Sequence, residues 1–593
     1  MTKQIQTIAG AIYCWLYSHI LSILQPLRPG PKELTRETEK HVITNTKSPL
    51  LALRPTINGI LRSSGAMGAS VAIFDGKTEK TYFEGFGRRD KDYPSKPDEH
   101  TVYHLASLSK SFTAAAMGLL AAEGKLKFED PISKVVPEFH YPDEKIRTES
   151  TILDFLSHRT GLASKNALWQ QDGHELLLEK TDTMGMVSNL EVVHPLGEQW
   201  LYNNWGYDML GQVIERVSGI SWGEFINQRI LKPLNLNETT TALSPPHKNY
   251  AHGYMPGPRG KQTDVGRPVI AAGTVQQAAN GIKSTCSDLI TYYRALWTAF
   301  KRETSNDTSA KSVLKHVTTL VSPHIQMNAD NDSESYGAGW AIADLPSALG
   351  SIGTNGMFIP SMPLVGRGCE GHHDNNSEKK KKGPRIWYHN GSLVGFFSSV
   401  HVIQETGTII VVLINSIPKN DAADWIGQLI LEAMLNTPQR NDYLALAKTS
   451  AAAYDKMWKH LPAQIKRAKT SGGPSRSLAE YTGRYYNAPG NWFIEVKRTT
   501  AGNLEFLFQG RNSQRHRLEQ WGPDTFAWPL TEAQSRQRHR WPDLDVATYV
   551  FHFGLDPEGA RIGTLRWVHD PDVPEGETFV KAARPPRQAH SEL

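Results

Sequence analysis

The chain has 593 residues, of which 39% are hydrophobic and 21% are charged, and its formal net charge at pH 7 is +5. This composition is that of an ordinary globular protein, long enough for more than one domain. So small a net charge, without a recognition motif, gives no basis for a nucleic-acid partner. Three cysteines, Cys14, Cys286 and Cys369, are too few for a disulfide framework, although a single Cys286–Cys369 bridge stays open.

The N-terminal segment, residues 1–49, combines an apolar run with a polar linker. Residues 8–24 are mostly apolar but are interrupted by Ser18, His19 and Ser22. The run is short for a membrane span and lacks a clear small-residue cleavage site. It is therefore interpreted as a signal, a weak membrane anchor or an amphipathic surface helix. We expect a cytoplasmic location, with secretion or membrane anchoring as the alternatives.

The first chemical motif follows a β-hairpin predicted at residues 69–87. Ser107 and Lys110 open an Ala- and Leu-rich helical pattern, so they lie one turn apart on the same helix face. A Lys in an apolar pocket loses solvation and its pKa falls, which lets it act as the base for a Ser nucleophile. The same spacing recurs at Ser312 and Lys315. The apolar helix and the motifs downstream are what distinguish Ser107.

A second motif consists of Tyr202 and Asn204, which precede an amphipathic helix predicted at residues 207–217. A phenol close to a Lys ammonium is pushed toward phenolate, which would make Tyr202 a general base and later a general acid. The Asn204 amide carries both a donor and an acceptor, so it can orient Lys110 and a substrate.

A third motif, residues 389–392, opens a stretch of β-branched runs that predicts paired core strands between residues 385 and 415. Gly391 on an edge strand would let a substrate approach the backbone closely. A backbone N–H there would face that of Ser107 and form an oxyanion hole. Residues 353–385, rich in Gly and Pro, come just before this strand, and we interpret them as a wall or lid over the pocket or as a disordered segment.

The last part of the chain changes character. Residues 441–476 predict a long helix followed by a Gly- and Ser-containing linker. Residues 477–593 are dense in aromatics and predict a small antiparallel barrel or sandwich, which either binds a ligand inside or, as we expect, packs on the preceding domain as a structural appendage. The strands predicted there are residues 491–498, 503–510, 525–530, 546–554 and 561–570.

With the three motifs in this order, residues 50–435 resemble the serine β-lactamase and penicillin-binding protein superfamily, in particular its class C-like branch. The C-terminal region is similar to the lipocalin-like domain that follows some of these catalytic domains. The resemblance implies an α+β fold, with an antiparallel sheet between flanking helices and an all-helical subdomain, plus a C-terminal antiparallel β-barrel. The domains expected after the N-terminal segment are 50–440 (catalytic), 441–476 (helical linker) and 477–593 (barrel).

The resemblance also implies roles for the motif residues. Ser107 would be the acylated nucleophile, Lys110 its neighbouring base and Tyr202 a shared acid and base. Asn204 would position Lys110 or the substrate.

In the third motif, the resemblance places the backbone N–H of Ser392, together with that of Ser107, in the oxyanion hole next to Gly391. His389 stands where many relatives have the Lys of a K-T-G motif, which this chain lacks. A Lys there grips a substrate carboxylate, whereas a His with an ordinary pKa is mostly neutral at pH 7. This departure favours esters or amides without a terminal carboxylate. A hydrogen bond from His389 to Tyr202, without any influence on specificity, is the alternative.

These features predict a serine hydrolase or acyltransferase that acts on a small-molecule ester or amide through an acyl-enzyme on Ser107, with secondary metabolism as one setting. A D-amino-acid peptidase or carboxypeptidase is the enzymatic alternative. A catalytically silent binding scaffold is the alternative from another class, disfavoured because all the motif residues are present. We expect no cofactor and no metal, since His372, His373 and Asp374 lack ligand spacing. The oligomeric state stays open.

Overall fold

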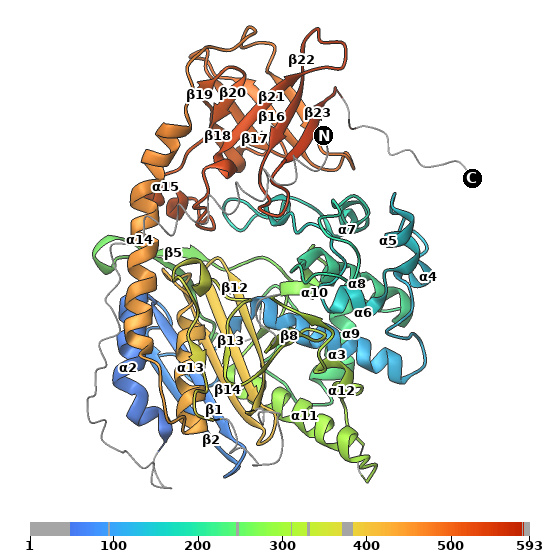
Figure 1. Ribbon diagram of the computed structural model, residues 1–593, viewed down its shortest axis with the longest axis vertical. Coiled ribbons are helices and arrows are strands. Elements are labelled where there is room, and N and C mark those ends of the chain that lie inside the picture. Colours follow the sequence, from blue (N-terminus) through green and yellow to red (C-terminus); the bar gives the residue numbers. More distant parts are fainter. Residues whose placement is uncertain are drawn as a thin grey trace, which may run out of the picture.

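The computed structural model describes residues 48–92, 95–244, 248–309, 311–328, 333–369, 383–583 and 585. The chain forms a central antiparallel sheet between helical layers, a mostly helical region beside it, and a barrel-shaped sheet at the C-terminal end (Figure 1). The predicted α+β class with a C-terminal antiparallel barrel is confirmed. The apolar run at residues 8–24 lies outside the described residues. Among the helices that are described, none has the length and apolar character needed to cross a membrane.

Eight antiparallel strands form the central sheet. They are β1 (Gly68–Asp75), β2 (Lys80–Gly87), β7 (Ile325–Gln326), β8 (Glu334–Tyr336), β9 (Ala341–Asp344), β12 (Arg385–Leu393), β13 (Phe396–Ile403) and β14 (Thr408–Ile414). Their order in the sheet is β2-β1-β14-β13-β12-β9-β8-β7. The strands β13 and β14 are buried along their whole length, as their continuous apolar sequence predicts for a sheet covered on both faces.

Helices cover both faces of this sheet. The flanking helices are α2 (Pro49–Ser64), α11 (Cys286–Ser305), α13 (Ala422–Leu435) and α14 (Tyr443–Ala468). On one face α13 lies on β13 and β14, and α2 and α14 pack against it. On the other face α11 contacts β1 and β14. Figure 1 shows α14 continuing from this layer toward the barrel.

The helical region beside the sheet carries two of the motifs. Its helices are α3 (Ser109–Ala122), α4 (Ile132–Val135), α5 (Glu144–Glu149), α6 (Ile152–Leu156), α7 (Thr183–Val187), α8 (Asn204–Ser218), α9 (Trp222–Ile226) and α10 (Gln277–Asn280). The side chain of Asn203 accepts a hydrogen bond from Gly206 N and caps α8, while Gly219 ends the helix in a left-handed conformation. This cap fixes where α8 begins, and therefore where Tyr202 and Asn204 lie.

The strand β12 was predicted to be an edge strand. Its first half has a neighbouring strand on both sides, and its second half has a neighbour on one side only. Its partner β9 pairs with Arg385 to Tyr388 and then ends. From His389 onward, one side of β12 has no neighbouring strand among the described residues, while β13 continues to pair on the other side. The third motif therefore lies on a local free edge, created by the short length of β9.

The described part of the segment 353–385 is not a wall over this edge. Its residue Asn355 is buried, and its amide donates to Asp421 O and Asp424 Oδ2 (both 3.0 Å) at the start of α13. This places residues 353–369 on the α13 side of the sheet, opposite to the side from which Ser107 approaches. Residues 370–382 lie outside the described residues. Cys286 and Cys369 are both free, so the disulfide left open by the sequence does not form.

The C-terminal sheet has nine antiparallel strands in the order β18-β17-β16-β15-β23-β22-β21-β20-β19. Its strands are β15 (Gly483–Tyr486), β16 (Phe493–Arg498), β17 (Leu504–Phe508), β18 (Arg515–Arg517), β19 (Glu519–Gly522), β20 (Thr525–Ala527), β21 (Val550–Leu555), β22 (Ile562–Trp567) and β23 (Glu577–Lys581). Interlocked aromatic rings fill its core: Phe506, for example, contacts Phe508, Trp528 and Phe551 with ring centroids 4.8–5.3 Å apart. These rings form a packed core, which supports a structural appendage rather than a ligand-binding barrel.

The barrel packs on residues 163–178, called here the bridging segment, which lies between the barrel and the helical region (Figure 1). Asp172 in this segment is 5% exposed as a side chain and pairs with Arg538, Arg540 and His516 from the barrel region. Burial alone would raise the pKa of Asp172, but the hydrogen bond from His516 and the charges of Arg540 and Arg538 lower it below its ordinary value.

We expect Asp172→Asn to destabilise the protein by about 3–5 kcal/mol, because it removes the buried carboxylate that Arg538, Arg540 and His516 share and leaves Arg540 with Asp543 alone. Since the folded-state pKa of Asp172 is lowered, its stabilisation is complete above a pH of about 4 and is lost as the pH falls further. Calorimetric melting at pH 7 and pH 3.5 tests this, with Glu138→Gln, in an exposed pair with Arg216, as the control. A similar Tm for Asp172→Asn and Glu138→Gln at pH 7 would contradict it.

Candidate active site

Ser107 lies in a short helical turn, Ala106–Leu108, that leads directly into α3. The residue before it, Ala106, has φ +51°, a left-handed conformation that is rare for residues other than Gly and that marks a strained turn. Flanking contacts hold this turn: Leu105 N donates to Ile282 O (3.0 Å), and Ser398 Oγ donates to Leu105 O (2.8 Å). Ser107 itself is 8% exposed, so little of it reaches the protein surface.

Lys110 is completely buried beside this serine. Its Nζ lies 3.1 Å from Ser107 Oγ, 2.7 Å from Asn204 Oδ1 and 3.3 Å from Ala279 O. No acidic side chain among the described residues forms an ion pair with it. Burial therefore lowers the pKa of Lys110 well below its ordinary value, as expected for an amine in an apolar pocket.

Tyr202 lies against this pair, with its ring centroid 4.8 Å from Lys110 Nζ and 4.3 Å from the ring of His158. The expected phenolate is not supported, because burial raises the pKa of Tyr202 and contact with the Ser107 hydroxyl offsets only part of that rise. The Tyr202 hydroxyl has no other partner within the described chain. The physical reason is that burial removes the water that would stabilise a charged phenolate.

Gly391 brings β12 into direct contact with the turn that carries Ser107. A Cβ atom at this position would lie 2.4 Å from both Leu105 O and Ser398 Oγ, so only Gly fits. The hairpin of β12 and β13 closes on Leu393 and Phe396 with a two-residue turn, which makes this a hydrogen-bonded pair. By alternation, the N–H of Ser392 points away from β13 and toward the free edge, on the side of the Ser107 turn.

His389 is buried next to the same edge and is held by Tyr336. Its Nε2 lies 3.0 Å from Tyr336 Oη, and its Nδ1 donates to the carbonyl of Asn390 (2.6 Å), so Nε2 accepts from the phenol. The alternative of a bond from His389 to Tyr202 is therefore wrong, since the imidazole bonds to Tyr336. Burial, with a smaller contribution from Lys110, lowers the pKa of His389 to about 3, so the ring is neutral at pH 7.

The structure thus brings all the motif residues together, and it adds several that sequence reasoning missed. Asn280 Oδ1 accepts a hydrogen bond from Ser107 Oγ (3.3 Å), and Asn166 Oδ1 accepts one from Asn204 Nδ2 (3.0 Å). Neither residue stands in a motif, and each reaches the site from a segment far along the chain.

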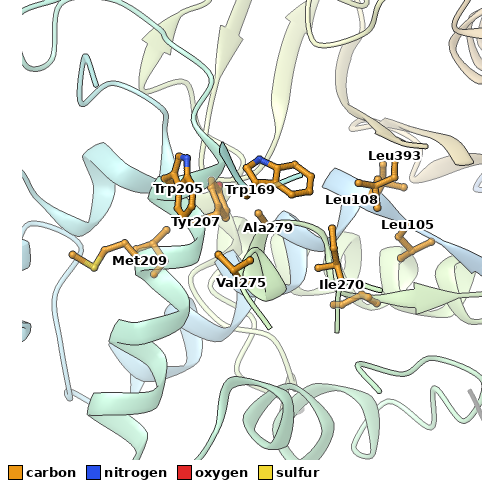
Figure 2. Packing of buried hydrophobic residues seen from close by; sticks show 14 of the residues in the cluster. Leu105, Leu108, Trp169, Trp205, Tyr207, Met209, Ile270, Val275, Ala279 and Leu393 are labelled. Carbon is orange, nitrogen blue, oxygen red and sulfur yellow. The ribbon is translucent and has the colours of Figure 1, made fainter. Parts of the chain in front are cut away.

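Apolar side chains surround these polar groups. Trp169, from the bridging segment, belongs to the same buried cluster as Leu108, Tyr207 and Ala279. Figure 2 shows the Trp169 indole above Ala279, between Tyr207 and Leu108. Such walls exclude water from the Lys110 amine.

An antiparallel sheet between helical layers, with a Ser–Lys pair at its junction with a helical region, defines the fold class of the serine β-lactamases. A family model described as Beta-lactamase matches residues 53–434, more than half of the chain. The protein therefore belongs to the β-lactamase family.

Individual relatives match over shorter stretches. Penicillin-binding protein 4* of Bacillus subtilis (strain 168) is 33% identical over 184 residues, covering 29% of this chain and 39% of that protein. Protein flp of Staphylococcus aureus (strain MW2) is 32% identical over 178 residues, covering 29% and 34%. This chain thus spans less than half the length of these curated relatives. The octameric penicillin-binding protein homologue from Pyrococcus abyssi matches with a TM-score of 0.50 and 21% identity over 90% of this chain and 100% of that chain, a similarity of fold.

We expect Lys110→Arg to lower turnover by at least about 10³-fold, because a guanidinium stays protonated and cannot accept a proton. In the unchanged protein, activity should fall as the pH drops below the lowered pKa of Lys110, since protonation removes the base. Steady-state rates of ester hydrolysis between pH 5 and pH 9 measure both effects. Lys134→Arg, an exposed pair member on α4, is the control. Activity of Lys110→Arg within tenfold of that of the control would rule out Lys110 as the base.

Proposed function

We propose that this protein is a serine hydrolase or acyltransferase that forms an acyl-enzyme on Ser107 and acts on uncharged small-molecule esters or amides. The observation that carries the proposal is the position of the buried Lys110 amine, 3.1 Å from Ser107 Oγ and without an acidic partner among the described residues. A neutral amine at this distance can activate an alcohol, whereas a paired ammonium cannot.

The hydrogen-bond partners of Lys110 support the direction of this proton transfer. A neutral amine has two N–H donors and one lone pair. Asn204 Oδ1 and Ala279 O can only accept, so they take both N–H groups. The lone pair is then left for Ser107 Oγ, whose proton it would accept once the hydroxyl turns from Asn280 Oδ1 toward Lys110.

In the proposed reaction, Ser107 Oγ attacks the carbonyl carbon of the substrate and its proton moves to Lys110. The N–H groups of Ser107 and Ser392 would stabilise the tetrahedral oxyanion. The leaving alcohol or amine takes the proton back, either from Lys110 directly or through the Tyr202 hydroxyl, and the acyl group stays on Ser107. Water, or a second alcohol or amine, then attacks the acyl-enzyme by the reverse sequence of proton transfers.

The electrostatics of the pocket support an uncharged substrate. His389 occupies the position of the Lys of K-T-G, and its Nε2 is already bonded to Tyr336. With a pKa of about 3 it carries no charge at pH 7, so it cannot replace the cation that grips a carboxylate. Amides of D-amino acids remain the alternative substrate class, and they should be assayed alongside the esters.

We expect Ser107→Ala to remove nearly all turnover, by about 10⁴-fold or more, while the protein stays folded, because no other serine in the described part of the chain has this partner set. Release of p-nitrophenol from short-chain esters and labelling with a fluorophosphonate measure it. Ser312→Ala is the matched control, since Ser312 and Lys315 repeat the S-x-x-K spacing. More than a few per cent of residual activity in Ser107→Ala would show that the nucleophile lies elsewhere.

The charge argument predicts that the protein prefers a p-nitrophenyl ester to a penicillin, and that His389→Lys moves this preference toward the penicillin by about ten- to a hundredfold. The ratio of the two kcat/KM values is the measured quantity. His140→Lys adds the same charge at an exposed position and should leave the ratio unchanged. A preference for penicillin in the unchanged protein, or a ratio that does not move in His389→Lys, would defeat the argument.

A further inference from the structure

A continuous set of hydrogen bonds connects Lys110 to the C-terminal barrel. Lys110 Nζ donates to Asn204 Oδ1 (2.7 Å), and the other end of the same amide donates to Asn166 Oδ1 (3.0 Å). Asn166 belongs to the bridging segment, and the two residues before it, Ser164 and Lys165, bond directly to the barrel. The helix α8, the bridging segment and the barrel thus all contribute, directly or through one another, to the surroundings of the Lys110 amine.

The barrel holds the bridging segment at its most unusual backbone position. Lys165 has φ +37°, a left-handed conformation that a non-Gly residue keeps only when its surroundings impose it. Asp570, in the loop between β22 and β23, accepts from Lys165 N (2.6 Å) and from Ser164 Oγ (3.2 Å). Glu577, at the start of β23, pairs with Lys165 Nζ (3.1 Å), and both side chains are at least 94% buried. These bonds fix the backbone immediately before Asn166.

The fixed Asn166 in turn determines how the Asn204 amide is oriented. Asn166 Oδ1 accepts from Asn204 Nδ2 and also from Trp169 Nε1 (3.2 Å), so both of its lone pairs are used. A reversed Asn204 amide would put two acceptor oxygens together and would present N–H groups to Lys110. Only the observed orientation gives Lys110 an acceptor, which leaves its lone pair directed toward Ser107.

We propose that Asn166 is a positioning residue for Lys110 and that the barrel residues Asp570 and Glu577 hold it in place, so that the barrel completes the active site. The inference rests on the proposed function, because it assigns Asn166 a role in orienting the base of that reaction. The family model matches residues 53–434, and the barrel lies outside them. The residues that hold Asn166 in place therefore come from a part of the chain that the family model does not cover.

The experiment compares full-length variants with p-nitrophenyl acetate as the probe. Asp570→Ala and Asn166→Ala should each lower kcat by about 10- to 100-fold, with KM within about twofold, because displacement of the base costs rate and little contact area. Water that reaches a loosened Lys110 would raise its pKa, and so the acid limb of the kcat profile should move to higher pH. Asp570→Asn keeps an oxygen that can accept both bonds, and it should recover most of the lost rate.

Arg511→Ala is the matched control. It removes a 2.8 Å pair between the barrel and Glu175 of the same segment, without a link to Asn166. It should change Tm like the test variants but leave the pH profile in place. An unchanged kcat and pH profile in Asn166→Ala, or the same shift in Arg511→Ala, overturns the inference. If Asp570→Ala fails to fold, Asp570→Asn and Asn166→Ala decide the outcome.

Turnover by Ser107→Ala separates this result from failure of the proposed function. If Ser107→Ala is inactive while Asn166→Ala is fully active with an unchanged pH profile, the nucleophile assignment stands and the positioning role falls. If Ser107→Ala keeps full activity, the proposed function itself fails, and the inference falls with it.

Discussion

Burial of the Lys110 amine without a carboxylate is the constraint on which the rest of the site depends. Taking an ammonium out of water costs several kcal/mol, so a buried lysine without an acidic partner is kept neutral. The neutral amine still needs acceptors for two N–H groups, and α8 and α10 each supply one. These helices pack on α3 and on each other, so the arrangement of three helices determines the direction of one lone pair.

Burial has the same effect on the titratable groups next to Lys110, because it disfavours their charged forms as well. Burial lowers the pKa of Lys110, His158 and His389 and raises that of Tyr202, so it favours the uncharged form of all four groups. Proton transfer inside such a pocket moves a single charge within a neutral, water-excluded surrounding, where fixed N–H dipoles act strongly. The free half of β12 provides such dipoles, and Gly391 lets them approach Ser107.

The sequence predicted the α+β class, the first hairpin, α8 and the core strands, because apolar periodicity and local caps decide those elements. It also named the side chains that gather around Ser107, whose spacing along the helix is local. It did not predict Asn166, Asn280 or Tyr336, since each reaches the site through long-range packing. The phenolate expected at Tyr202 is not supported for a related reason: the sequence shows a lysine motif near Tyr202, but it does not show that the whole group is buried. In the barrel, β15, β18, β19 and β23 were missed, three of them no longer than four residues and without clear alternation. The domain boundaries stay predictions.

The link between Asp570 and Lys165 joins residues 405 positions apart, which has a consequence for how the protein matures. Contacts of such separation form late, because the intervening chain must be ordered first. During synthesis from the N-terminus, Ser107, Lys110 and the sheet can fold before the last strands of the barrel exist. The left-handed turn at Lys165 then lacks its carboxylate partner. On the proposed roles of Asn166 and Asp570, a growing chain would therefore carry an inactive site, and full reactivity would appear only when nearly the whole protein has been made.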